Sequence, residues 1–370
     1  ISVGEFLHFI ASPSLSTLPM HHVENILFNV VHHGKSEKRM AASKKLTRSW
    51  GAKYTIVDSG GYEILMAYIL NANITHDPDR PIICTKKQLN ITPQHVVAAG
   101  AAMNPDILIA LDYPILKISD PVLQKIEFNR KIKINAKWAK ETAELQMVQC
   151  PGVQLFLPIQ CYTIAQFDVY LNCIGNVAYD GFCMPVRNLN SSEIILFLIR
   201  FYQLGVSKVH LLGTETYINF ALSAYMSKHY FQWFSLDATS SKKYGFCGVY
   251  LHPDNLSAIR IGKKPALTDE IINKCRCPWC ANRNLSYIAN LPKTDQAVFF
   301  MCHNFWVTEN VCKRLYEHTN NLISFNKYLM NISENKNKAK VQRLCDALML
   351  ADALKDNDIK TLQSVLPGRK

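Results

Sequence analysis

The sequence predicts an α/β fold, a (β/α)8 TIM barrel with a zinc-binding insertion and C-terminal helices. Two observations predict it. Short apolar runs that end in a polar or glycine residue alternate with helical patterns up to about residue 250. A tight group of cysteines and further helical patterns follow. The chain has 370 residues, of which 48% are hydrophobic and 19% charged, and this composition excludes disordered and low-complexity proteins.

Several apolar runs have the length of buried strands. They lie at 54–58, 106–112, 153–160, 177–183, 208–213 and 233–237, and EFLHFI at 5–10 could be the first strand. Helical patterns are found at 37–50, 93–103, 120–147, 191–202 and 216–228. Such alternation predicts a parallel sheet, and at least six units favour a barrel. An open doubly wound sheet is the alternative, although no glycine-rich phosphate motif follows an early strand.

The predicted strand ends carry polar residues and glycines, which in a barrel lie at the face that holds the chemistry. They are Asp58, Asp112, Gln160, Gly181, Gly213 and Asp237. A single aspartate at such a position can equally cap the following helix. Three aspartates together with Gln160 favour a functional site over capping alone.

A second candidate site is metal-binding. Cys275, Cys277 and Cys280 lie within six residues, and His303 follows further along. Three thiolates and one imidazole are typical of tetrahedral Zn²⁺, and four protein ligands make the ion structural rather than catalytic. The alternative is a chance cluster of buried thiols, with His252 and Cys302 as competing ligands.

The composition change near residue 250 suggests three parts. We expect a catalytic barrel over 1–265, a zinc-binding subdomain over 266–310 and C-terminal helices over 311–370, with helical patterns at 304–330 and 337–365.

The chain is basic, with 41 Lys plus Arg against 29 Asp plus Glu and a net charge of +12, which favours a polyanionic partner. Local clusters can equally be solvated helix faces. They comprise Lys125, Arg130, Lys131, Lys133, Lys137 and Lys140; Lys242 and Lys243; and Lys336, Lys338, Lys340 and Arg343.

Membrane and secreted classes are not expected. No apolar run reaches the roughly 20 residues of a membrane helix, and the start contains Glu5 and no basic leader. Scattered cysteines in apolar contexts are typical of a reducing compartment. We therefore expect a cytoplasmic protein.

Seven motifs, in this order, resemble those of the tRNA-guanine transglycosylase superfamily. They are DSGGY at 58–62, LDYP at 111–114, PIQ at 158–160, the glycine-bearing DGF at 180–182 and LG at 212–213, FSLD at 234–237, and the cysteine group with a later His-Asn pair. Together they cover most of the chain from about Tyr54 to Asn304.

The resemblance implies exchange of guanine in a nucleic acid for a 7-deazaguanine base, without cutting the backbone. Asp237 would be the nucleophile at C1′ and Asp58 the acid/base. Asp112 would accept the donor edge of the base, and Gln160 and a backbone N–H at Gly181 would donate to its carbonyl. Tyr62 and Leu212 would sandwich the ring, Ser59 and Gly213 would complete the site, and the target base would be flipped from a duplex.

Two departures favour DNA over tRNA as the substrate. Ala238-Thr239-Ser240 follows the expected nucleophile, and the Gly181 strand continues without an acidic residue. Both suit the DpdA-type 7-deazaguanine DNA transglycosylases of bacterial or phage-infected cells, with 7-cyano-7-deazaguanine as incoming base and a possible helper protein for DNA access. The alternatives are a tRNA-guanine transglycosylase of the queuosine/archaeosine type and a non-catalytic nucleic-acid-binding partner subunit. Retention of Asp58 and Asp237 argues against the second.

Overall fold

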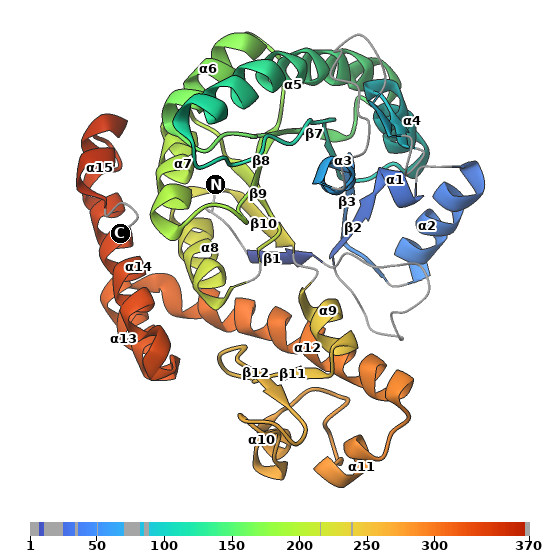
Figure 1. Ribbon diagram of the computed structural model, residues 1–370, viewed down its shortest axis with the longest axis vertical. Helices are drawn as coiled ribbons and strands as arrows, with labels where there is room; N and C mark the ends of the chain where they lie inside the picture. The colour runs from blue at the N-terminus through green and yellow to red at the C-terminus, as the bar shows by residue number, and fades with distance from the viewer. Residues whose placement is uncertain are drawn as a thin grey trace. The chain divides into compact units, whose positions relative to one another are not determined.

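An eight-stranded sheet organises the fold of the chain. The computed structural model describes residues 7–10, 25–33, 36–49, 51–69, 82–84, 89–214, 216–237 and 240–366. Along the sheet the strands follow the order β1-β10-β9-β8-β7-β6-β3-β2 (Figure 1). Their bounds are β1 (Leu7–Ile10), β2 (Asn25–Asn29), β3 (Tyr54–Asp58), β6 (Ile107–Ile109), β7 (Gln154–Pro158), β8 (Gly181–Pro185), β9 (Lys208–Leu212) and β10 (Trp233–Asp237).

The strand order is that of a (β/α)8 barrel. From β2 to β10 the strands are neighbours in their order along the chain, and the pairs from β2 to β9 are parallel. The first strand pairs in parallel with the last, from Leu7↔Phe234 to Ile10↔Asp237. Parallel strands that follow one another in chain order, with helices between them, are typical of such a barrel. The predicted α/β barrel is therefore confirmed.

The chain divides into two compact units. One comprises His22–Leu189 and Lys208–Leu212, and the other Ile1–His21, Asn190–Ser207 and Gly213–Lys370. Strands β2, β3 and β6 to β9 belong to the first unit, and β1 and β10 to the second. The domain boundaries expected at 265 and 310 remain a prediction.

The first unit alternates its strands with helices, and side-chain caps begin three of them. Thr92 caps α4 in a reciprocal bond with His95, Asp120 caps α5, and Thr163 caps α6, which satisfies backbone N–H groups that the helix itself leaves open. The helices are α1 (Val30–His33), α2 (Glu37–Ser49), α3 (Gly61–Ile69), α4 (Pro93–Met103), α5 (Pro121–Gln149) and α6 (Ile164–Ile174), with a two-stranded ribbon of β4 (Ile82–Cys84) and β5 (Leu89–Ile91).

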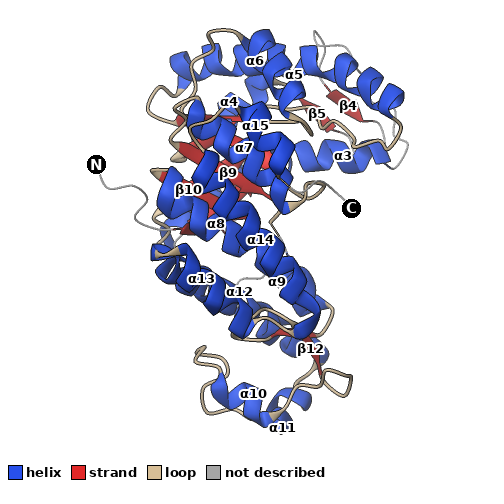
Figure 2. Ribbon diagram, turned by 90° about the vertical axis from the view of Figure 1, so that its left-hand side faces the viewer, coloured by secondary structure: helices blue, strands red, loops and turns tan. Residues whose placement is uncertain are grey.

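The second unit is mostly helical after β10. Its elements are α7 (Ser191–Gln203), α8 (Tyr217–Tyr230), α9 (Ser240–Phe246), β11 (Val249–Leu251), β12 (Ala258–Arg260), α10 (Asp269–Lys274), α11 (Leu285–Ala289), α12 (Lys293–Glu317), a 3-10 turn η1 (His318–Asn320), α13 (Leu322–Ile332), α14 (Asn335–Leu354) and α15 (Ile359–Val365). Helix α14 packs on α7 and α8 (Figure 2). Asp352 of α14 accepts hydrogen bonds from Tyr225 and Tyr230 of α8, so polar contacts fix this packing.

The structure differs from the expected elements in two strands and one helix. The strand expected at 177–183 begins only at Gly181 and runs to Pro185. Asp180 precedes the strand: its N–H donates to the Leu155 carbonyl, and its side-chain Oδ2 accepts the Leu155 N–H. Strand β2, NILFN, was not anticipated, because its apolar run has only three residues. The helix expected at 304–330 is split, since η1 separates α12 from α13. Among the described helices, none is both long and apolar enough to cross a bilayer.

Candidate functional site

The Asp58 carboxylate is fixed at the carboxyl end of β3. Its Oδ2 accepts a hydrogen bond from Asn29 Nδ2 at 3.1 Å and one from the Gly60 backbone N–H at 3.3 Å. Asn29 ends β2 and lies beside Asp58 in the parallel register. The half-buried carboxylate is thus held by two donors that come from two neighbouring strand ends.

The two glycines after Ser59 are required by close packing. Gly60 has a φ of +93°, and a Cβ there would overlap the Val31 side chain. A Cβ on Gly61 would overlap both carboxylate oxygens of Asp112. The turn therefore needs glycine once for its backbone conformation and once because a carboxylate lies directly against it.

Asp112 is the centre of a buried hydrogen-bonded group. Its side chain is 5% exposed, and it accepts hydrogen bonds from Ser59 Oγ at 3.0 Å and Gln160 Nε2 at 2.5 Å. Burial raises the pKa of Asp112 to about 6, against the opposing effect of the two hydrogen bonds. A carboxyl group with such a pKa can change its protonation state close to neutral pH.

Three segments expected to form one site therefore meet in the first unit. Ser59 and Gly61 follow β3, Asp112 follows β6 and Gln160 follows β7, and these strands pair in parallel, so their carboxyl ends lie at one edge of the sheet. Hereafter Asp58, Ser59, Gly61, Asp112 and Gln160 are called the Asp112 group.

Asp237 lies in the second unit, at the end of β10. It is 8% exposed, its Oδ1 accepts the Gly213 N–H at 2.9 Å, and its backbone carbonyl accepts the Thr214 N–H at 2.9 Å. Gly213 has a φ of +73°, a conformation that favours glycine. The Asp237 carboxylate is thus oriented by a backbone donor.

The structure does not place Gly181 with these residues. Gly181 begins β8 and pairs with Phe156 in β7, so it lies toward the amino ends of the strands, away from Gln160. A Cβ at Gly181 would come within 2.6 Å of the Lys208 carbonyl oxygen, so the glycine serves strand packing. The expected position of Gly181 at a strand end is therefore wrong, and its role in base binding remains a prediction.

At the carboxyl end of β8, Pro185 and Val186 do not supply a free backbone N–H that could replace the donor expected at Gly181. Pro185 has no N–H, and the Val186 N–H donates to the Leu212 carbonyl at 3.1 Å. Leu212 ends β9 and is half-buried, which suits contact with a ring. Tyr62 is the second residue of α3, and its side chain lies outside the described part of the structure.

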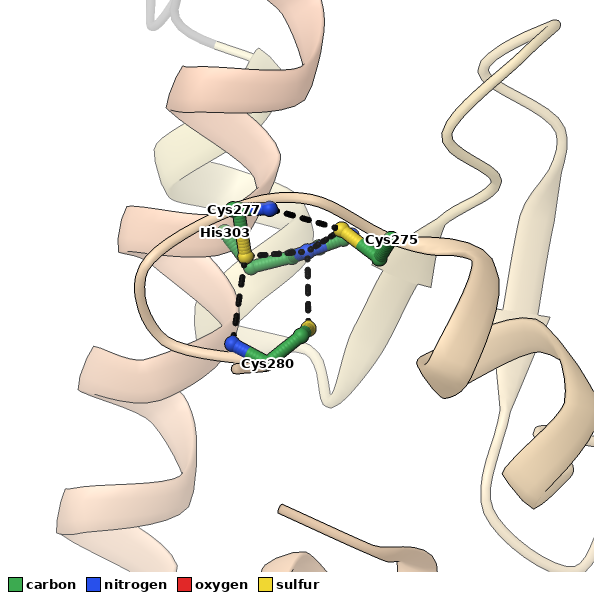
Figure 3. Close-up of side chains that lie close together, drawn as sticks. All are labelled: Cys275, Cys277, Cys280 and His303. Carbon is green, nitrogen blue, oxygen red and sulfur yellow. Dashed lines mark hydrogen bonds between the residues drawn. The ribbon is translucent and has the colours of Figure 1, made fainter. Parts of the chain in front are cut away.

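The cysteine cluster is assembled by a short loop and one long helix. Cys275, Cys277 and Cys280 follow α10, His303 lies in α12, and all four side chains are buried (Figure 3). The His303 Nδ1 lies 3.5 Å from the Cys275 sulfur and 3.4 Å from the Cys277 and Cys280 sulfurs. A tetrahedral zinc ion at about 2.3 Å from sulfur and about 2.0 Å from nitrogen would separate those atoms by about 3.5 Å.

Neighbouring groups orient the ligands for a metal. The second ring nitrogen of His303, Nε2, lies 2.8 Å from the Leu251 carbonyl oxygen, so it carries the proton and Nδ1 presents its lone pair to the cysteines. The Cys277 and Cys280 N–H groups point at the sulfurs of Cys275 and Cys277. This cluster can bind a metal ion with four ligands, whereas His252 and Cys302 do not belong to it.

Sequence reasoning missed residues that support the two sites. Asn29 holds Asp58, and its signal was an asparagine directly after a short apolar run. Tyr250 stacks on His303, with ring centroids 3.6 Å apart. Asn304 ties α12 to β11 by accepting the Leu251 N–H at 2.8 Å and donating to the Val249 carbonyl at 2.9 Å, so its pairing with His303 in the sequence has a structural reason.

The basic cluster of α5 is not uniform. Lys125, Lys133, Lys137 and Lys140 are exposed, but Lys131 is fully buried and pairs with Glu127 at 2.5 Å. Lys131 is therefore wrong as a contact for a polyanion. The side chains of Lys242 and Lys336 lie outside the described part of the structure.

None of the protein-family models compared with the chain matches it, and no curated protein sequence matches it either.

Proposed function

We propose that this protein is a glycosyltransferase that exchanges guanine in DNA for a 7-deazaguanine base. The observation that carries the proposal is the Asp112 group, in which the motifs DSGG, LDYP and PIQ meet. Ser59 of DSGG and Gln160 of PIQ lie 53 and 48 residues from Asp112 of LDYP, and both donate hydrogen bonds to its buried carboxyl. The order and content of these motifs are those of the guanine transglycosylases that the sequence resembles.

The proposed reaction is a double displacement at C1′ of the target nucleotide. The Asp237 carboxylate attacks C1′, the N-glycosidic bond breaks, and its electron pair leaves with guanine, which takes a proton from Asp58. The ionised Asp58 then removes a proton from the incoming base, whose nitrogen attacks C1′ and releases Asp237. Two inversions retain the configuration, as in retaining glycosidases.

Base recognition is assigned to Asp112 and Gln160. The ionised carboxylate of Asp112 can accept the N1–H and 2-amino group of a guanine-type base. Gln160 has two amide hydrogens, so it can hold Asp112 with one and donate the other to the carbonyl oxygen of the base. Burial of the carboxyl makes these hydrogen bonds stronger than they would be in water.

A basic and aromatic surface on the second unit supports a nucleic-acid partner. Gly245 of α9 packs against the Met301 backbone, so a side chain there would clash. The residues on either side of Gly245 in the chain are exposed, namely Lys243, Tyr244, Phe246 and Cys247. Arg260 joins this surface by donating to the Cys247 carbonyl at 3.1 Å, and exposed Lys263 and Lys264 follow at a glycine turn.

The composition of this surface suits a single strand that has been opened for base exchange. Between 240 and 264 the chain has five Lys or Arg and one acidic residue, Asp254, and Asp254 is paired with Arg314 at 3.1 Å. Lysine and arginine bind phosphates, and exposed rings stack on bases. The stretch begins three residues after Asp237, the proposed nucleophile.

The metal of the cysteine cluster is proposed to be Zn²⁺. Three thiolates and one imidazole are its usual structural donor set. The four residues would hold the loop 275–280 on α12, and the ion would stabilise the fold without taking part in the reaction.

The experiment is uptake of radiolabelled guanine or 7-cyano-7-deazaguanine into duplex DNA, single-stranded DNA or tRNA. Uptake into DNA is expected, and Asp237→Asn should abolish it. Uptake into tRNA alone would make the protein a tRNA-guanine transglycosylase. Polymer binding without uptake into any of the three, in the presence of zinc, would favour a non-catalytic binding subunit and refute the proposal.

A further inference from the structure

The loop that follows Asp112 has no regular structure, yet side chains hold most of its backbone polar groups. Residues 113–118 lie in the connection between β6 and α5. Seven of its backbone groups bond to side chains: the N–H and carbonyl of Tyr113, the carbonyl of Pro114, the N–H and carbonyl of Ile115, and the N–H groups of Leu116 and Ile118. Loops of this kind normally expose such groups to water.

Most of these bonds come from one stripe of α5. Gln124, Glu127, Lys131 and Asn135 are spaced by three and four residues and so project from one face of the helix. Asn135 accepts the Tyr113 N–H at 2.6 Å and donates to the Tyr113 carbonyl at 3.0 Å. This residue alone therefore fixes both polar groups of the residue next to Asp112.

The buried ion pair of α5 continues the stripe. Lys131 donates to the Pro114 carbonyl at 2.8 Å and pairs with Glu127 at 2.5 Å, and Glu127 accepts the Leu116 N–H at 3.4 Å. Gln124 accepts the Ile118 N–H at 2.6 Å. A buried lysine and glutamate are costly unless they are paired and hydrogen-bonded. Here each also bonds to the loop backbone, and Glu127 pairs in addition with Arg130 at 2.7 Å.

The β7 side of the loop joins it to the Asp112 carboxyl. Gln160 accepts the Ile115 N–H at 3.5 Å through Oε1 and donates to Asp112 Oδ2 through Nε2. Tyr162 donates its hydroxyl to the Ile115 carbonyl at 2.6 Å. The side chain that orients Asp112 is thus itself oriented by the loop that α5 holds.

We infer that Gln124, Glu127, Lys131 and Asn135 are positioning residues, which fix loop 113–118 and, through Gln160, the carboxyl of Asp112 that recognises the base. The inference rests on the proposed function for the identity of the base. The hydrogen bonds from these four residues to loop 113–118, called the clamp below, rest only on the contacts given above. The loop is accordingly a rigid wall beside Asp112 and not a lid that opens and closes. Opening it would remove the Asn135 partner from both polar groups of Tyr113 and the Lys131 partner from the Pro114 carbonyl.

The test compares Asn135→Ala with a matched variant of the same helix, Gln146→Ala. Gln146 also makes two buried hydrogen bonds to backbone, donating to the carbonyls of Cys150 at 3.0 Å and Val153 at 2.5 Å, but these residues precede β7. Both variants should lower stability to a similar extent. Hydrogen exchange followed by mass spectrometry should show at least about ten-fold faster exchange of 113–118 in Asn135→Ala only.

Steady-state kinetics decide whether the clamp acts on base recognition. Asn135→Ala should raise KM for the incoming base by about ten-fold or more and change kcat less than about three-fold, because base binding in the ground state is what weakens. Gln146→Ala should change neither. Equal KM values for the two variants, or unchanged exchange of 113–118 in Asn135→Ala, would overturn the inference.

A milder variant keeps the test decisive if Asn135→Ala does not fold. Gln124→Ala removes one bond, to Ile118, and should loosen the loop and raise KM in the same direction by about three-fold. A wild-type protein that exchanges no base refutes the proposed function and leaves the clamp to the hydrogen-exchange result alone. A wild-type protein that is active, with Gln124→Ala unchanged in both measurements, refutes the clamp alone.

Discussion

The cysteine cluster and the Asp112 group hold polar side chains in opposite ways. Three of the four cluster ligands lie within six residues of chain, and one loop presents them to His303. The Asp112 group takes its members from three strand ends, and Asp112 is bound by residues 53 and 48 positions away. The first is a local closed site suited to a structural ion, and the second depends on the whole sheet.

This difference predicts that the two sites separate stability from activity. Substitutions in the cluster should unfold the protein and release metal, because metal binding is part of the folding free energy. Substitutions among the carboxylates should reduce exchange and leave the fold intact, because buried charge at an active site is held at some cost to stability. The following experiments test this separation, from the largest expected effect to the smallest.

Asp237→Asn should lower the rate of base exchange by at least about 10⁴-fold, equivalent to about 5 kcal/mol. The amide cannot act as the nucleophile, but it can still accept the Gly213 N–H, so the unfolding free energy should change by less than about 1 kcal/mol. Label uptake and denaturation in urea measure the two effects. A variant with more than a tenth of wild-type exchange contradicts the assignment of the nucleophile.

Cys277→Ser should lower the unfolding free energy by about 4 kcal/mol and reduce bound zinc below one equivalent. Elemental analysis and chemical denaturation measure these changes. Cys302→Ala is the matched control, because Cys302 is a buried thiol one residue from His303 that lies outside the cluster. It should keep full zinc content. Equal metal loss in both variants would contradict the ligand assignment.

Asp112→Asn should stabilise the protein at pH 8 by up to about 3 kcal/mol while abolishing base binding. The folded-state pKa of Asp112 is about 6 and its ordinary value is 3.8, and the difference corresponds to about 3 kcal/mol. The folded protein holds the proton more tightly than the unfolded chain, so this group favours folding most below about pH 4, and that stability is lost as the pH rises through 6.

Denaturation in urea at pH 4, 6 and 8 measures this dependence. The wild type should lose stability relative to Asp112→Asn across that range, and the difference should level off above about pH 7. Binding of the base to the wild type should weaken as the pH falls below 6, since the neutral carboxyl accepts fewer hydrogen bonds. If the difference in unfolding free energy between the two proteins did not change with pH, the Asp112 carboxyl would have its ordinary pKa and would be exposed to water.

Gly61→Ala should lower exchange by about 30-fold and stability by about 2 kcal/mol, because its Cβ would push the Asp112 carboxylate away from Ser59 and Gln160. Gly152→Ala is the control, since a Cβ at Gly152 meets no atom within 4 Å. It should change neither quantity measurably. Activity assays and thermal denaturation decide, and equal behaviour of the two variants would remove Gly61 from the site.

Much of the fold was predictable because its strands are continuous apolar runs. The runs ending at Asp58, Gln160 and Asp237 gave strands at or within two residues of the expected ends, since a barrel strand is buried on both faces and shows no polar alternation. The run at 177–183 misled because aromatic and apolar letters in a turn resemble a strand. The residue that begins β8, Gly181, was therefore mistaken for one at its end.

The sequence by itself determined the alternation of strands and helices, the strand-end aspartates and the four residues of the metal cluster. Hydrophobic period and ligand spacing are local properties, so they can be seen along the chain. Tertiary structure alone decided that Ser59 and Gln160 share the Asp112 carboxyl, that Gly181 serves packing, and that Lys131 is buried beneath the loop and not offered to a polyanion. Those outcomes depend on which distant backbone groups need a hydrogen-bond partner once water is excluded, and that requirement exists only in the folded protein.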